Sequence, residues 1–153
     1  MPRPGNRGKD LDAGEIVTLA ASAARGATAG TNGTAVVLSG ERVGIMIVCE
    51  FTAKAMDVDD TCDVYVDVSH DGTKWINAIH FTQALGNGTD AATEYAVLVP
   101  SGANTAPTVA TSDCASGAVR GDAFGAQMRA RWVIVDPGGG AASFTFSVIG
   151  YAI

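Results

Sequence analysis

Hydrophobic and polar residues alternate along most of this 153-residue chain, with a period of two rather than 3.6. Such alternation places successive side chains on opposite faces of a β-strand. Short clusters of Gly, Asn, Asp and Ser separate the alternating runs, as turns would. The pattern predicts about eight strands, at residues 15–19, 34–39, 42–53, 62–69, 74–83, 93–99, 126–135 and 143–152.

The strongest local signal is a hairpin between the fourth and fifth of these strands. Valines at every second position of residues 64–68 fall on one face, and a more polar set falls on the other. The Asp-Gly pair at 71–72 supplies the left-handed backbone that a tight hairpin turn requires. The return strand begins at Trp75, and we expect Trp75, Ile79 and Phe81 to share one face.

The seventh predicted strand has one polar and one apolar face, which is typical of a sheet covered on one side only. Its polar positions are Gln127, Arg129, Arg131 and Val133, and its apolar positions are Met128, Ala130, Trp132 and Ile134. Helix signals are weak, because the alanine-rich residues 19–29 favour at most one or two helical turns. Residues 101–124 lack a strong period, and a loop of that length is usually functional or held against a partner.

Short strands in this number predict an all-β fold, an antiparallel β-sandwich of the jelly-roll kind. We expect a single domain at residues 15–153, preceded by an extended arm at residues 1–14 whose prolines and glycines exclude a helix. A hydrophobic fraction of 47% excludes disorder as a description of the whole chain. We expect neither a membrane span nor a secretory signal, because no apolar run is long enough for the first and no apolar stretch follows the basic N-terminus.

Charge is distributed unevenly along the chain. Arg3, Arg7 and Lys9 give residues 1–9 a charge of +3, whereas the other seven basic and all 16 acidic residues give the remainder −9. The net charge of −6 argues against a nucleic-acid partner, which needs clustered Lys and Arg. A basic arm on an acidic body indicates that the arm contacts a negative surface, unless it is a solvated tail that keeps the chain soluble.

Side chains suited to catalysis or metal binding are few. Cys49, Cys62 and Cys114 have no close spacing and predict free thiols, with Cys49 buried in an apolar run. His70 lies beside the hairpin turn, and we expect His80 on the more exposed face of its strand. No nucleophile motif accompanies either histidine, and their spacing from Cys62 matches no zinc site. We therefore predict no enzymatic activity and no cofactor.

An acidic cluster follows the third predicted strand, and it comprises Asp57, Asp59, Asp60, Asp63, Asp67 and Asp71. Its first members offer the hard oxygen ligands that Ca²⁺ prefers. They lack the glycine and the distant glutamate of an EF-hand loop. A solvated acidic loop is therefore the simpler interpretation, and a cation site is the alternative.

Two pairs of larger side chains also have two interpretations each. Arg129 and Arg131 project from the same face of one strand, where a cross-strand ion pair is the ordinary explanation and contact with another subunit is the alternative. Trp75 and Trp132 offer a carbohydrate platform, since jelly rolls include lectins. Their apolar neighbours favour core packing instead.

The predicted hairpin also carries a family resemblance. The string DVYVDVSHDGTKW at residues 63–75, followed by Ile79-His80-Phe81, resembles small structural proteins of tailed bacteriophages. Those proteins have a V-x-V-x-x-S-x-D-G-x-x-W hairpin, then an irregular stretch, then a strand introduced by Gly-Asp. The later part resembles residues 121–131 here, so that the resemblance covers roughly residues 60–135.

This resemblance implies a virion component, and the size and strand count fit a capsid decoration (cement) protein. Such proteins are often β-rich trimers on the outer surface of the capsid, where they clamp the major capsid protein, commonly through an N-terminal arm. Free thiols fit assembly in a reducing bacterial cytoplasm, and the net charge and the lack of a long apolar run predict no nucleic-acid or membrane partner. The expected contact residues are Pro2, Arg3, Pro4, Arg7 and Lys9 in the arm, together with Arg129 and Arg131. The alternatives are another virion part (a head–tail joining, tail or head-fibre protein) and a carbohydrate- or calcium-binding jelly-roll module.

Overall fold

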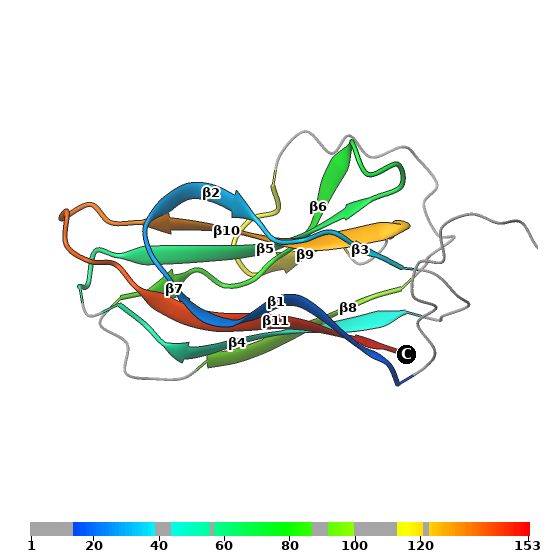
Figure 1. The fold of residues 1–153 in the computed structure, drawn as a ribbon, viewed down its shortest axis with the longest axis horizontal. Helices are drawn as coiled ribbons and strands as arrows, with labels where there is room; N and C mark the ends of the chain where they lie inside the picture. The colour runs from blue at the N-terminus through cyan, green and yellow to red at the C-terminus, as the bar shows by residue number, and fades with distance from the viewer. Residues whose placement is uncertain (1–13, 39–43, 56, 87–91, 100–112, 121–122) are drawn as a thin grey trace, which may run out of the picture.

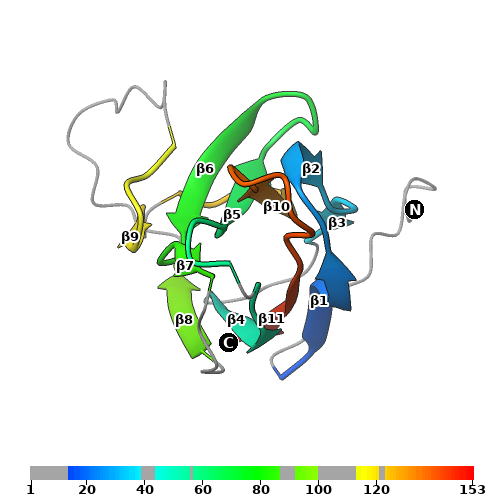
Figure 2. The ribbon, with the colours of Figure 1, turned by 90° about the vertical axis from the view of Figure 1, so that its left-hand side faces the viewer.

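Two antiparallel sheets lie one on the other in the computed structural model of the protein (Figure 1). The structure describes residues 14–38, 44–55, 57–86, 92–99, 113–120 and 123–153. Figure 2 looks along the strands and shows β8 below β6 at one side of the sandwich, with β1 below β2 at the other. The predicted all-β antiparallel sandwich is confirmed, and the described residues contain no helix.

The first sheet has four strands in the order β1-β11-β4-β8. Its members are β1 (Ile16–Arg25), β11 (Phe144–Ala152), β4 (Ile45–Ala53) and β8 (Ala92–Leu98). The second sheet has seven strands along the path β2-β10-β5-β6-β9, with β3 beside β10 and β7 beside β5. Its members are β2 (Thr28–Asn32), β3 (Val36–Val37), β10 (Gln127–Val135), β5 (Thr61–Ser69), β6 (Trp75–His80), β7 (Ala84–Leu85) and β9 (Ala118–Val119).

The core lies between the inward faces of the two sheets. Its largest fully buried side chains are Phe144, Phe146, Ile45, Ile47, Ile79, Leu98, Met128, Ile134, Val64, Val66 and Val68. Phe51 packs against Phe146 with ring centroids 5.3 Å apart. The alternation of the fourth and seventh predicted strands therefore places their apolar positions in the core, as expected.

All eight predicted segments contain a strand, and the structure adds β2, β7 and β9. The one or two helical turns that residues 19–29 could have formed are absent, because β1 continues to Arg25 and β2 starts at Thr28. Pairing of β1 with β11 along Ala23–Arg25 overrides the helix preference of alanine there. The guanidinium of Arg25 also donates to the carbonyl oxygens of Ala21, Ala23 and Phe146.

The predicted hairpin is formed by β5 and β6, but a β-bulge changes which residues share a face. Asn77 pairs with Asp67, whereas Ile79 pairs with Val66, so that Ala78 is the extra residue between them. The expectation that Trp75 shares a face with Ile79 is therefore wrong. Trp75 lies on the outer face with Asp67, and Ile79 lies in the core.

The connection of this hairpin spans residues 70–74 and is held by the Ser and Asp of the recognised motif. Ser69 Oγ donates to the carbonyl oxygen of Lys74 at 2.6 Å and accepts the amide of Gly72 at 2.9 Å. Asp71 Oδ1 accepts the amides of Thr73 and Lys74, both at 2.8 Å. Gly72 has a φ of 76°, as the Asp-Gly signal predicted. These contacts show that the Ser and the Asp-Gly pair of the motif stabilise the hairpin turn.

Candidate interaction surface

The outer face of the four-stranded sheet carries two rows of uncharged, mostly apolar side chains that run across all four strands. One row comprises Ile16, Tyr151, Met46 and Val97, and the next comprises Thr18, Ile149, Val48 and Tyr95. We call these eight residues the apolar face. Tyr95 is 71% exposed and Ile16 is 60% exposed. Exposed apolar side chains that adjoin in this way mark interaction sites more often than scattered ones do.

The apolar face arises from strands that are hydrophobic on both sides. In β4, Ile45 and Ile47 point into the core, while Met46 and Val48 point outward. Such continuous apolar runs are typical of strands buried on both faces. The sequence therefore held a signal for this surface, in runs such as Ile45–Val48, that the period of two concealed.

The area of the apolar face limits the interface that it can form by itself. Four strands about 4.8 Å apart and two rows about 7 Å apart cover on the order of 300 Å². A stable protein–protein interface buries about 800 Å² on each partner. Glu50 and Thr93 follow beyond the second row, so the face has a polar rim on that side. The apolar face therefore suits one part of a larger contact.

The outer face of the seven-stranded sheet is polar and centres on Asp67. Its carboxylate receives Arg131 Nε at 3.0 Å and Arg129 Nη2 at 3.5 Å. Arg131 also reaches the exposed Asp113, with 2.6 Å between Nη2 and Oδ1. Burial lowers the pKa of Arg131, but the hydrogen bonds and charges of Asp67 and Asp113 outweigh burial and raise it.

The two arginines are also stacked on aromatic rings. The Arg129 guanidinium lies 4.1 Å from the ring centroid of Trp75, and that of Arg131 lies 4.0 Å from the ring centroid of Tyr65. The cross-strand ion pair expected of Arg129 and Arg131 is therefore confirmed. Their contact with another subunit stays a prediction.

His80 lies on the outer face of its strand, as expected, but it is buried there. Its Nε2 is 2.8 Å from Asp63 Oδ1, and its Nδ1 is 2.8 Å from the carbonyl oxygen of Cys114. Both partners can accept hydrogen bonds from the ring. The segment at residues 113–120 covers this side chain, and the spacing of strand residues gave no sign of that cover.

Asn77 fixes the same segment to the sheet. Its Oδ1 accepts the amide of Cys114 at 2.8 Å, and its backbone oxygen accepts Arg120 Nη1 at 2.9 Å. Its Nδ2 donates to Asp67 Oδ1 at 3.2 Å and to the carbonyl oxygen of Ile79 at 3.0 Å. Part of the long segment, which we predicted to be functional or held against a partner, is thus held against its own sheet.

A group of carboxylates lies at the end of the sandwich where β4 turns into β5 and β10 turns into β11. We call Asp57, Asp59, Asp60 and Asp136 the acidic end. Burial, followed by the charges of Asp136, Asp57 and Asp59, raises the pKa of Asp60. In the described ranges no three His, Cys, Asp or Glu side chains are grouped to hold a metal ion. The alternative of a cation site in the acidic loop therefore gains no preformed cage of side chains.

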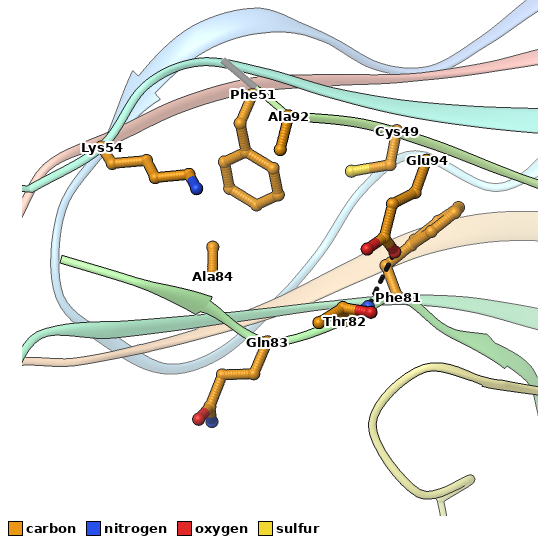
Figure 3. Close-up of a pocket in the computed structure, with 9 residues that line it drawn as sticks. All are labelled: Cys49, Phe51, Lys54, Phe81, Thr82, Gln83, Ala84, Ala92 and Glu94. Carbon is orange, nitrogen blue, oxygen red and sulfur yellow. Dashed lines mark hydrogen bonds between the residues drawn. The ribbon is translucent and has the colours of Figure 1, made fainter. Parts of the chain in front are cut away.

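A small pocket opens between the sheets beside β8 (Figure 3). Cys49 and Phe51 of β4 face Ala84 of the other sheet across it, and the amide of Thr82 donates to Glu94 Oε2 at 2.8 Å. Its volume is about 70 Å³, against about 300–1,000 Å³ for sites that take small-molecule ligands. The pocket is too small for such a ligand.

The cysteines are free, as predicted. Burial, together with the nearby Asp63, raises the pKa of Cys62 to about 12, and burial is the main cause that raises the pKa of Cys49. Cys114 is half-buried. Neither buried thiol is therefore a reactive nucleophile.

The tryptophans occupy different environments. Trp132 packs against the core, with its ring 5.7 Å from Phe146, which confirms core packing for this residue. Trp75 is half-buried beneath Arg129 on the outer face, so core packing is wrong for Trp75. The bulge at Ala78 is the physical reason for this difference.

The arm residues Pro2, Arg3, Pro4, Arg7 and Lys9 lie outside the described residues, as do Gly121 and Asp122 of the recognised pattern. Gly14, at the end of the predicted arm, donates its amide to the carbonyl oxygen of Ala152 at 2.9 Å.

No helix in the described part of the chain could span a membrane. No family model, no curated protein and no solved structure matches this chain.

Proposed function

We propose that the protein is a non-enzymatic bacteriophage capsid decoration protein, which binds the outer shell and stabilises it by bridging subunits of the major capsid protein. The observation that carries the proposal is the apolar face, which extends over all four strands of one sheet. Surfaces of this kind serve assembly, because burying them removes apolar area from water. The motif that resembles small virion proteins supports the same conclusion.

The strand order supports a jelly roll, the fold that we propose within the sandwich. If the eight predicted strands are numbered along the chain, one sheet reads 1-8-3-6 and the other 2-7-4-5. This is the order that two interlocked Greek keys produce. Jelly rolls are used by viral capsid proteins and by lectins, so the fold alone does not select the function.

In the proposed mechanism, two weak contacts together hold the protein on the capsid. The apolar face is too small for a stable interface by itself, and the basic arm at residues 1–14 provides the second contact. Ordering the arm costs conformational entropy, which its contacts with neighbouring subunits offset. Many copies on one closed lattice then add avidity. We place the protein as a homo-trimer on the capsid exterior.

Two alternatives lead to different measurements. A head–tail joining, tail or head-fibre protein would bind the virion at a few copies. A carbohydrate- or calcium-binding module would bind its ligand without a virion. The stacking of Arg129 on Trp75 occupies one face of that ring, which disfavours a sugar platform there.

The test is binding of variants to virions or empty capsids of the phage that encodes the protein. Tyr95→Lys places a charge on the most exposed residue of the apolar face, and we expect the affinity to fall by about thirtyfold, as for an interface hot spot. Val135→Lys is the matched control, because Val135 is an exposed residue of the other sheet. Equal binding by both variants, at unchanged melting temperatures, would refute the role of the apolar face.

A further inference from the structure

We propose that the acidic end of one copy binds the basic N-terminal arm of a second copy. This inference does not depend on the capsid proposal, because it concerns the free protein. The arm supplies Arg3, Arg7 and Lys9, and the acidic end supplies carboxylates on two neighbouring turns.

The carboxylates of the acidic end lack basic partners within the described parts of the chain. No ion pair with a Lys or Arg forms at Asp57, Asp59, Asp60 or Asp136 among these residues. Asp57 Oδ1 accepts the amide of Asp59 at 3.3 Å, and Asp136 accepts the amides of Gly140 and Ala142. The negative charges of neighbouring carboxylates repel one another, and an incoming cation relieves that repulsion.

Asp60 provides an independent indication of a ligand. The residue is 2% exposed, and its Oδ1 is buried without a hydrogen-bond partner. A buried carboxylate normally has hydrogen-bond partners, because an unpaired one is costly. Asp60 lines a hollow of about 340 Å³ together with Asp57, Lys54 and Ser143. A cationic side chain inserted there would find this carboxylate at the wall of the hollow.

Chain length limits which charges of the arm can reach the acidic end of their own copy. Gly14 is bonded to Ala152, and the next residue, Ile153, is bonded to Gly44, so the arm leaves the sandwich level with the start of β4. The acidic end follows Ala53, at the opposite end of the same strand (Figure 1). Nine residues from Gly44 to Ala53 span about 30 Å.

The arm is too short for all its charges to reach the acidic end of its own sandwich. Lys9 stands five residues before Gly14, and five residues extend at most about 18 Å. Arg7 reaches about 25 Å and Arg3 about 40 Å by the same measure. Lys9 therefore contacts an acidic end only on another copy. Contacts of this head-to-tail kind close into a ring or continue as a chain, and three copies would form a trimer.

The test is a zero-length carbodiimide cross-link in the full-length protein, with equal parts of ¹⁴N- and ¹⁵N-labelled copies mixed before reaction. We expect mixed-isotope peptides that join Lys9 to Asp57 or Asp59. Cross-links from Lys54 within one chain serve as an internal standard, since Lys54 lines the same hollow. Cross-links from Lys9 that join only like isotopes, or that avoid the acidic end, would overturn the proposal.

A second measurement follows the oligomeric state of the protein and does not depend on Lys9. The Asp57→Asn and Asp59→Asn double variant retains an oxygen acceptor at each site but loses both charges. We expect its self-association to weaken by about two- to thirtyfold, for two exposed pairs, and that of the natural chain to weaken at 0.5 M salt. Glu50→Gln removes an exposed charge from within β4, outside the acidic end, and should have no effect. A monomeric natural chain, or equal association of all three, would contradict the proposal.

Discussion

Replacing Asp67 with alanine should destabilise the sandwich more than removing any other single charged side chain from the outer face of a sheet. The Asp67 side chain is 4% exposed and receives Arg131, Arg129 and Asn77. Its removal leaves two half-buried guanidinium groups without their shared carboxylate. Breaking a fully buried pair costs about 3–5 kcal/mol and losing an exposed pair costs about 0–1 kcal/mol. The intermediate burial of the arginines gives about 2–4 kcal/mol here.

The assay is urea and thermal unfolding of the natural chain and its variants. For a chain of this size, about 3 °C of melting temperature corresponds to 1 kcal/mol, so Asp67→Ala should lower it by about 6–12 °C. Asp113→Ala is the control, because Asp113 contacts the same Arg131 from a side chain that is 46% exposed. Its expected cost is below about 1 kcal/mol. Equal losses from the two variants would refute the argument from burial.

Three further outcomes follow from the core, the hairpin turn and the thiols. Phe146→Ala should cost about 3–5 kcal/mol in urea unfolding, because the ring is fully buried between the sheets. Backbone hydrogen bonds lower the pKa of Asp71, so its contribution to stability is present above the ordinary pKa near 4 and lost as pH falls toward the lower folded value. Asp71→Asn should therefore flatten the acid limb of a pH–stability curve. A thiol reagent should modify the half-buried Cys114 first, and reaction of Cys49 or Cys62 in the native protein at an equal rate would contradict their burial.

The strand pattern predicted the fold because both sheets bury one side of alternating strands. The core contains the alternate residues that the period of two placed there, namely Val64, Val66, Val68, Met128, Ala130 and Ile134. Tertiary pairing decided the exceptions. The alanines of β1 pair with β11, and the bulge at Ala78 turns Trp75 outward. The local sequence gives little information about the pairing of β1 with β11 or about the position of the bulge.

The candidate surfaces were predictable only in part. The basic arm, the acidic cluster and the pairing of Arg129 and Arg131 follow from charge and strand position. The burial of His80 does not, because a segment some 34 residues away along the chain covers it. The apolar face also requires the register of four strands, which brings Ile16 into line with Val97 across the sheet.

Co-sedimentation of the purified protein with virions or empty capsids, with bound copies counted, tests the proposed function most directly. The decoration proposal predicts hundreds of copies per particle, in a ratio that fits the three-fold positions of the lattice, and a loss of binding when residues 1–14 are removed. A few copies per particle would instead place the protein at the neck, vertex or tail. No binding at all would contradict the account and favour a ligand-binding module.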